Sequence, residues 1–338
     1  MALLERYRRS VASKVLIPQI VVIIVSLIIV VLVAVIGIDG LKQQTIENEV
    51  HLIKSRLTTF IDMRKTVLLV GTASLSKDTL IADAIENGDN AALQQLINNQ
   101  KDNVINEVLR MTNKEAKGTT TRIQVINKNG VIVASTSEKN ADGVISQAVG
   151  ENVSDSWAFR KISAKSGFVS TIDYDKQGII LRALAPIVKN GEMIGALQMV
   201  EDLRDTVDNF VKSNGFIYML NLSPKFNSYA KNVKGSLYYN DGLVINSDDI
   251  DIKLLDVIKA YGLNKDTVTL LAADHFFMPV NFNMFTSTSS DRSITSGDYV
   301  GTLYLATPAE NIFAIVNKAS GVAIQLLSVF ILAFIIST

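Results

Sequence analysis

The hydrophobic pattern opens with a long apolar run near the N-terminus. Residues 20–38 are apolar except Ser26 and Gly37. A helix of that length rises about 28 Å, close to the hydrocarbon thickness of a bilayer. A cleaved signal peptide is the alternative, but its apolar core usually spans about 7–15 residues and a small-residue cleavage site follows it. We therefore predict a membrane-spanning helix over residues 15–39.

A second apolar run covers residues 321–338, which is marginally long enough to span a bilayer. Thr307, Pro308 and Glu310 have the spacing of a helix start, with a capping threonine and a glutamate three positions later. We expect one helix to run through residues 308–320 into this second span. Because no charged flank closes the run, we expect the sequence to be a fragment whose cytoplasmic part is missing. A C-terminal anchor with nothing beyond it is the alternative.

Between the two runs, residues 41–70 have the pattern of a long helix with an apolar stripe of period 3.5. The stripe consists of Ile46, Val50, Ile53, Leu57, Phe60 and Val67, with Arg64 in the intervening slot. Two interpretations stay open. The stripe forms a coiled-coil seam with a second subunit, or it packs on the helix's own domain, and both can hold at different heights along the helix. Further helices are predicted over residues 75–85 and 91–111.

The pattern then changes to strands. Asn129-Gly130 separates two β-rich runs at residues 122–128 and 131–136, which predicts a hairpin. A polar, helical insertion is expected over residues 142–165. Three strands forming a meander follow, with turns at 175–178 and 189–191, and a helix starts after Asp202.

A second stretch with a similar but less clear order of predicted strands and helices follows. The predicted strands are residues 215–222, 236–246, 267–273, 276–285 and 298–308, with a helix over 251–261. The predicted fold class is α+β, with a long N-terminal helix and two tandem modules, 40–213 and 214–307, built on antiparallel sheets between two membrane helices.

Composition narrows the possible functions. The chain carries 33 Lys+Arg against 33 Asp+Glu, no cysteine and two histidines. Balanced charge argues against a nucleic-acid binder. The missing cysteines exclude disulfides and thiolate sites, and so few histidines argue against a multi-histidine metal site. No enzyme motif is present, so we expect no catalysis, no cofactor and no metal.

Charge around the first apolar run predicts the orientation in the membrane. Arg6, Arg8, Arg9 and Lys14 precede the run, against Glu5 alone. By the positive-inside rule, residues 1–14 are cytoplasmic and residues 40–318 are periplasmic or extracellular.

Two segments of the first module carry a family resemblance. VINKNGVIVAST and GFVSTIDYDKQGIILRALAPIVKNGEMIGALQMVEDL resemble the hairpin and closing meander of the double Cache (PAS-like) extracytoplasmic sensor domain of bacterial receptors, most like methyl-accepting chemotaxis proteins. The resemblance implies that the membrane-distal module binds a small ligand between its sheet and the helical insertion. The amino-acid-binding pattern of the family has an arginine before its tryptophan and a tyrosine after it. Trp157 is present here without either, which puts amino-acid binding in doubt.

The candidate ligand-binding residues are Trp157, Arg160, Tyr174, Arg182, Gln198 and Asp202. Trp157 either anchors the insertion or forms a pocket wall. Arg182 interrupts an apolar strand, so it needs a partner or a solvated face, and its planar guanidinium suits a ligand carboxylate. Only one of Asp173 and Tyr174, which alternate along a strand, can face the ligand.

These features together predict a homodimeric inner-membrane receptor for a small extracytoplasmic solute, with a carboxylate as the candidate class. Chemotaxis, through cytoplasmic signalling partners, is the leading output. The alternatives are the same sensor on a histidine kinase or nucleotide cyclase, and a non-sensory membrane-tethered ectodomain.

Overall fold

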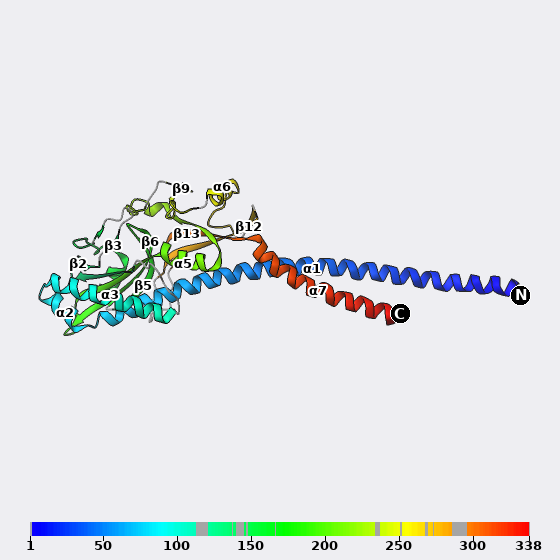
Figure 1. Ribbon diagram of the computed structural model, residues 1–338, viewed down its shortest axis with the longest axis horizontal. Helices are drawn as coiled ribbons and strands as arrows, with labels where there is room; N and C mark the ends of the chain where they lie inside the picture. Colours follow the sequence, from blue (N-terminus) through cyan, green and yellow to red (C-terminus); the bar gives the residue numbers. More distant parts are fainter. Residues whose placement is uncertain are drawn as a thin grey trace. The chain divides into compact units, whose positions relative to one another are not determined.

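The structure is a computed structural model that describes residues 2–112, 121–136, 138–139, 145–146, 148–165, 167–233, 237–250, 252–267, 270–272, 274–285 and 296–337 (Figure 1). The chain divides into two compact units, Met1–Leu52 with Ala309–Thr338, and Ile53–Pro308. We describe each unit by itself.

The first unit consists of two helical segments. Helix α1 (Ala2–Leu75) runs through the predicted first span without a break, and helix α7 (Ala309–Ser337) contains the second. Two stretches of helix, within Ile24–Leu75 and over Ala309–Val329, are long and apolar enough to cross a membrane. The predicted cap at Thr307 is wrong. Strand pairing continues through Pro308, α7 starts at Ala309, and the buried hydroxyl of Thr307 has no hydrogen-bond partner among the described residues.

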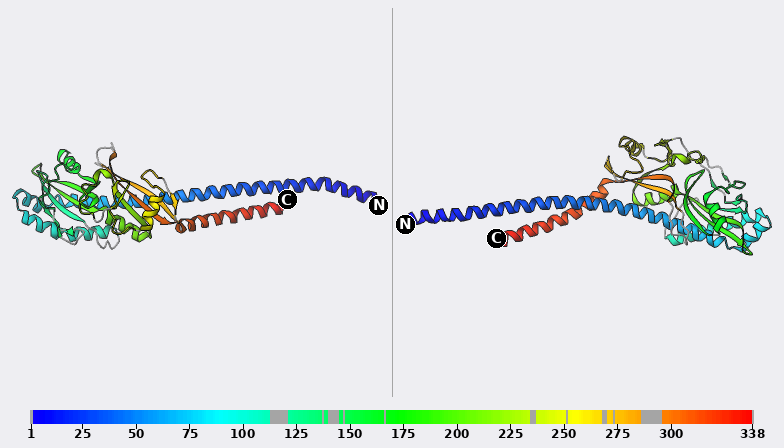
Figure 2. Two further views of the ribbon diagram at one scale, coloured as in Figure 1. Left: turned by 90° about the horizontal axis from the view of Figure 1, so that it is seen from above. Right: turned by 180° about the vertical axis from the view of Figure 1, so that it is seen from behind.

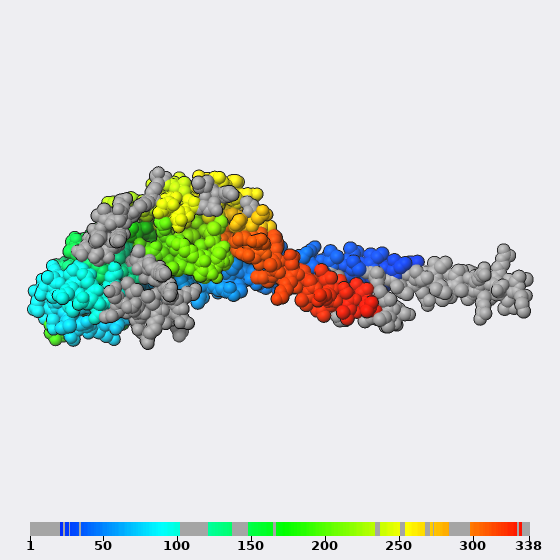
Figure 3. All heavy atoms as spheres, in the orientation of Figure 1, coloured from blue at the N-terminus to red at the C-terminus, as the bar shows by residue number. Residues whose placement is uncertain are grey.

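In the second unit, the remaining part of α1 packs its apolar stripe on its own chain. Ile53, Leu57 and Val67 are buried, and Leu57 has no exposed surface at all. Helices α2 (Thr79–Glu86) and α3 (Asn90–Thr112) follow, and the atoms of α2 and of the first part of α3 lie at one end of this unit, in cyan in Figure 3. Over this stretch of the helix, the interpretation in which the stripe packs on its own domain is therefore correct.

The first sheet has five antiparallel strands in the order β2-β1-β7-β6-β5. Its strands are β1 (Arg122–Asn127), β2 (Ile132–Ser135), β5 (Val169–Asp175), β6 (Gly178–Lys189) and β7 (Glu192–Asp202). The predicted hairpin and three-strand meander are both confirmed. Between them lie the short pair β3 (Glu138–Lys139) and β4 (Ile145–Ser146), and helix α4 (Trp157–Lys165). Part of the predicted insertion lies outside the described residues.

The turns follow from the residues that occupy them. Asn190 and Gly191 both have positive φ, at 51° and 84°, which is the geometry of a tight turn between antiparallel strands. The β1–β2 turn differs. There only Gly130 has positive φ, and the Asn127 side chain accepts hydrogen bonds from the N–H groups of Asn129 and Val131. Helix α5 (Leu203–Asn214) then starts directly after β7.

The second sheet has four antiparallel strands in the order β11-β12-β13-β8. They are β8 (Ile217–Leu222), β11 (Leu270–Ala272), β12 (His275–Phe285) and β13 (Ser296–Pro308). Around them lie η1 (Pro224–Phe226), the pair β9 (Tyr238–Tyr239) and β10 (Gly242–Leu243), and α6 (Ile252–Ala260). The predicted strand over 236–246 is thus much shorter than expected, and residues 268, 269 and 273 of another lie outside the described residues.

The two sheets are in contact within the second unit (Figure 2). Strand β5 contacts both β12 and β13. The Tyr174 ring of β5 stacks on Phe226 of η1, with 4.0 Å between ring centroids. The α+β architecture is confirmed, with its long N-terminal helix, antiparallel sheets and apolar C-terminal helix. The boundary between modules at 213/214 stays a prediction, because both sheets belong to one compact unit.

Candidate ligand-binding site

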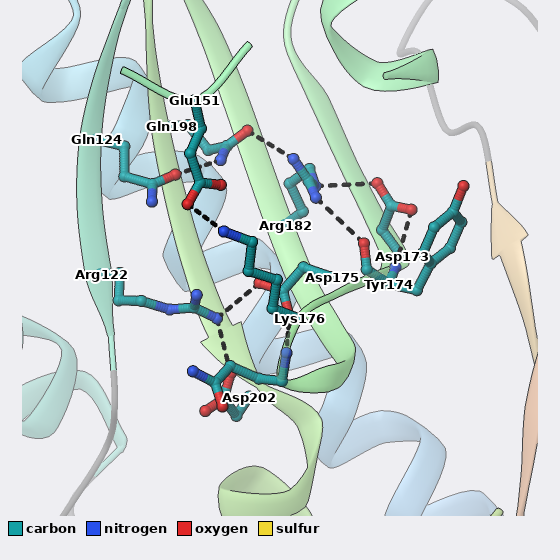
Figure 4. Close-up of polar contacts among 11 residues, drawn as sticks. Arg122, Gln124, Glu151, Asp173, Tyr174, Asp175, Lys176, Arg182, Gln198 and Asp202 are labelled. Carbon is teal, nitrogen blue, oxygen red and sulfur yellow. Dashed lines mark hydrogen bonds and ion pairs between the residues drawn. The ribbon is translucent and has the colours of Figure 1, made fainter. Parts of the chain in front are cut away.

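One face of the five-stranded sheet carries an unusual number of polar side chains. Residues that pair directly across antiparallel strands point to the same face. Arg182 of β6 pairs with Val200 of β7, which pairs with Arg122 of β1, and Gln198 of β7 pairs with Gln124 of β1. We call this set the polar cluster: Arg122, Gln124, Asp173, Asp175, Arg182, Gln198 and Asp202 (Figure 4).

Arg182 lies at the centre of the polar cluster, and its side chain is almost fully buried. Its Nε is 2.9 Å from Oδ2 of Asp173, an ion pair without the alignment of a hydrogen bond. Its Nη1 donates to Oε1 of Gln198 at 2.9 Å, and its Nη2 donates to the carbonyl oxygen of Tyr174 at 3.4 Å. The arginine that the sequence flagged therefore has three protein partners.

Burial raises the pKa of the Asp173 carboxyl, and the positive charge of Arg182 partly offsets that rise. The N–H of Tyr174 also donates to Oδ1 of Asp173 at 2.9 Å, which favours the charged form. Asp173 and Arg182 thus depend on each other, because neither charge is stable alone away from water.

The rest of the polar cluster is connected in two short chains. Nε2 of Gln198 donates to Oε1 of Gln124 at 2.6 Å, which extends the Arg182 chain onto β1. Nη2 of Arg122 lies 2.7 Å from Oδ1 of Asp202 and 3.0 Å from Oδ2 of Asp175. Two arginines and three aspartates therefore share this face, so their formal charges leave a small negative excess.

Helix α4 covers the apolar end of the same face. Its residues Ala158, Phe159 and Ile162 form a core cluster with Ile126, Val169 and Leu184 of the sheet. Trp157 is half-buried and packs against this cluster, with Nζ of Lys161 6.0 Å from its ring centroid. Arg160 is exposed. Helix α4 therefore packs on the sheet face that carries the polar cluster, in agreement with the expected insertion over the sheet.

Only some of the six predicted ligand-binding residues lie together in the polar cluster. Arg182 and Gln198 are in direct contact, and Asp202 is in the same cluster through Arg122. Tyr174 contributes its carbonyl oxygen, while its ring lies away from the polar cluster against Phe226. Of the alternating pair, it is Asp173 whose side chain faces Arg182.

Sequence reasoning missed Arg122, Gln124 and Asp175 as members of the cluster. The signal was present in β1, where Arg122 and Gln124 alternate with Ile123 and Val125, so both polar residues must share a face. Which β7 residues lie beside Arg122 and Gln124 depends on how β1 and β7 pair, and the sequence of a single strand does not determine that pairing.

The opposite face of the sheet holds one buried ion pair. Glu201 of β7 is bound by Arg64 of α1, through Nε to Oε1 at 3.1 Å and Nη2 to Oε2 at 2.5 Å. The Thr206 hydroxyl of α5 donates to Oε1 of Glu201 at 2.6 Å. The Ser170 hydroxyl of β5 also donates to the carbonyl oxygen of Lys65, so α1 is attached to this face at more than one point.

Comparison with known proteins gives the chain a family. Residues 43–223 match the dCache_3 family, described as the double sensory domain of two-component sensor kinase, and this match covers more than half of the chain. No curated protein is similar enough to count as a match.

Several solved structures are similar at low identity. The sensor domain of the Vibrio cholerae histidine kinase DctB has 14% identity and a TM-score of 0.40, covering 78% of this chain and 98% of its own. The ligand-binding domain of the Pseudomonas fluorescens chemoreceptor CtaA, in complex with L-isoleucine, has 10% identity and a TM-score of 0.36, covering 81% and 96%. That of the Campylobacter jejuni chemoreceptor Tlp3, in complex with L-valine, has 12% identity and a TM-score of 0.38, covering 81% and 97%. Likenesses this weak say nothing about which solute this chain binds.

Proposed function

This chain belongs to the double Cache sensor family, and from that premise we propose that it is the input half of a membrane receptor for a small extracytoplasmic solute. The solute binds at the polar cluster, next to the apolar end of the face that α4 covers, and the signal leaves through α7. Binding rather than catalysis is the role that we propose for residues 40–318.

The observation that carries this proposal is the burial of the polar cluster itself. A sheet face turned towards a covering helix is normally apolar, because buried polar groups cost stability unless every one is paired. Here Arg122, Gln124, Asp173, Arg182 and Gln198 are all buried on one face. Convergent polar groups beside an apolar wall are the usual composition of a small-molecule site.

The charges of the polar cluster narrow the class of solute. The sequence pointed to a carboxylate held by Arg182, but that guanidinium already faces the Asp173 carboxylate. A simple organic anion would compete with Asp173 and meet a face with more aspartates than arginines. We therefore propose a solute that carries a positively charged amine, either alone or together with a carboxylate that Arg182 shares.

We propose that the receptor spans the membrane twice, with residues 1–14 in the cytoplasm. Two helices with enough apolar length flank the sensor region, and the basic residues Arg6, Arg8 and Arg9 precede the first. Chemotaxis is the output that we propose. A histidine kinase is the second candidate, because the matched family is described as a domain of sensor kinases.

Reading the coding sequence past Thr338 distinguishes the two outputs. A long coiled coil rich in glutamate and alanine would support the chemoreceptor, and a kinase core would support the second candidate. A stop codon at that point would contradict both.

We also propose a homodimer formed through the exposed face of α1. The stripe that contains Leu57 is covered by the chain itself, so it is not available to a partner. Met63 and Val70 are apolar, exposed and two helical turns apart, and the exposed Thr59 and Thr66 continue the same stripe. This exposed stripe is the surface on which we place the second copy.

A ligand screen tests the binding proposal directly. We expect amines or amino acids to raise the thermal unfolding temperature of the full chain in detergent, since a ligand at 100 times its dissociation constant adds about 2.7 kcal/mol. The matched control is Asp202→Asn, which removes one charge at the polar cluster without changing side-chain size and should weaken the effect. Stabilisation by simple organic acids alone would contradict the proposed solute class, and stabilisation unaffected by Asp202→Asn would contradict the proposed site.

A further inference from the structure

Two consecutive residues at the end of β7 point to opposite faces of the first sheet and bind different arginines. Asp202 belongs to the polar cluster, where Arg122 binds it at 2.7 Å. Glu201, with no exposed surface, is bound on the other face by Arg64 of α1. Side chains of adjacent strand residues project to opposite sides, while their Cα atoms stay about 3.8 Å apart.

Arg64 is an odd residue for its place. It occupies a slot in the apolar stripe of α1, between the buried Ile61 and Leu68, and only 4% of its surface is exposed. A buried ion pair is a poor way to gain stability, because apolar residues of similar size often serve as well or better. The stripe would accept a leucine or methionine here, so the pair calls for a role other than stability.

The contacts around Glu201 are directional. Arg64 holds both carboxylate oxygens, and Thr206 in the first turns of α5 donates to one of them. Glu201 is therefore attached to the helix before the sheet and to the helix after it. A two-pronged guanidinium contact fixes orientation as well as distance, so a turn of the strand end changes the position that Arg64 must take.

We propose that the Glu201–Asp202 step is the link through which the polar cluster acts on α1. The inference rests on the proposed function, because it takes the polar cluster to be the solute site. A solute that draws Arg122 or Asp202 towards itself turns the end of β7. Glu201 turns with it on the other face, and the Arg64 contact passes the movement to α1.

The link can be tested without any solute, by perturbing the polar cluster genetically. Arg122→Gln removes the cation that holds Asp202. The readout is amide hydrogen exchange of α1 residues 61–68, measured on the full chain in detergent. Arg122→Gln is introduced into two backgrounds: the chain with the native Arg64–Glu201 pair, and the chain in which Arg64→Met/Glu201→Leu replaces that pair by apolar residues. Lys225→Gln is the control, since it breaks an exposed ion pair with Asp298 that involves neither β7 nor α1.

In the native background, we expect Arg122→Gln to raise exchange of α1 residues 61–68 at least two-fold, the smallest coupling usual for residues in one network. In the apolar background, we expect no rise. An equal rise in both backgrounds, or none in the native one, would overturn the link.

If the apolar pair does not fold, Arg64→Lys serves instead, because it keeps the charge and loses the two-pronged contact. The rise should then shrink, and an undiminished rise would count against the proposal. A negative hydrogen-exchange result would overturn only the proposed link. It would not change the result of the ligand screen, which tests the receptor function independently.

Discussion

At the scale of single residues, the Arg182–Asp173 pair has the clearest consequence. The sequence showed that an arginine inside an apolar strand needs a partner, but not which one. Asp173 precedes it by nine positions and becomes its neighbour only because β5 and β6 pair in the register that sets Thr171 opposite Arg182. Register depends on the turn between the strands and on what covers each face, so it is a property of the packed sheet.

This pair gives a pH-dependent prediction. Arg182→Met should destabilise the protein by about 3–5 kcal/mol at pH 7, because it leaves Asp173 buried without a counter-charge. Burial already raises the pKa of Asp173 above its ordinary value of about 4, and losing Arg182 raises that pKa further. A raised carboxyl pKa adds stability at low pH that is lost as the pH rises through it, so the deficit should shrink on going from pH 7 to pH 4.

Thermal unfolding of the full chain in detergent at both pH values measures this deficit. The control is Arg182→Met/Asp173→Leu, which removes both charges and should recover most of the stability at pH 7. A deficit that is equal at the two pH values would show that Asp173 does not depend on Arg182.

At the scale of elements, helix α1 shows what a pattern determines and what it leaves open. The 3.5 period identified the apolar stripe from Ile53 to Val67 correctly, because any covering surface selects the same face of the helix. Whether that surface is a partner subunit or the first sheet is invisible in the helix's own sequence. The structure puts Leu57 inside the chain, which moves the expected contact with a partner to the opposite side.

We therefore predict that disulfide cross-linking between subunits follows the exposed stripe. The chain has no cysteine, so single substitutions give clean results. Met63→Cys and Val70→Cys should cross-link in membranes. Thr58→Cys, also exposed but roughly 140° away around the helix, should do so poorly. Cross-linking at Thr58 as strong as at Met63 would remove the stripe as the dimer surface.

The contact between the first sheet and the turn after β10 gives a further prediction at this scale. Gly178 ends the β5–β6 turn with φ 108°, and a Cβ there would lie 2.7 Å from Cδ1 of Ile245. Gly178→Ala should cost about 1–2 kcal/mol from backbone strain alone, with the overlap added. Ile245→Val removes the obstructing methyl group at about 0.5–1.5 kcal/mol. The double variant should lose less stability than the sum of the two single variants.

The matched control is Gly191→Ala. Its backbone is similarly strained, with φ 84°, but nothing lies within 4 Å of the added Cβ. Its effect should simply add to that of Ile245→Val in thermal unfolding. Additive losses for Gly178 as well would mean that the β5–β6 turn does not press on the turn that holds Ile245.

At the scale of the whole molecule, the sequence predicted most of the order of elements. All five strands of the first sheet were predicted because its turns carry strong local signals, such as Asn190-Gly191, but the pairing of β1 with β7 was not. The second sheet was predicted less well. The short strands β9 and β10 are held by distant groups, including the side chain of Asn221, which donates to the carbonyl oxygen of Tyr239. The β-strand propensities of neighbouring residues do not reveal such long-range contacts.

The membrane orientation is tested at this scale. Asp155 is exposed in the sensor region, so Asp155→Cys gives a single reactive site. If Arg6, Arg8 and Arg9 hold the N-terminus inside, as we propose, residues 40–318 are exported, and an impermeant thiol reagent should label this cysteine in intact spheroplasts. Labelling only after lysis would reverse the topology.

The junction between β13 and α7 limits how far β13 can move relative to its neighbouring strands. Strand β13 is hydrogen-bonded on both sides, to β12 and β8, and α7 starts at the next residue with no loop between them. A strand locked in this way can slip only in steps of two residues, about 6.8 Å, because a single-residue step would turn its buried side chains outward. Such a jump would break both hydrogen-bond ladders at once. If α7 carries the signal, as we propose, β13 can pass it on only through small movements that keep every strand of the second sheet in register, so loosening the β13 ladder should silence the receptor rather than activate it.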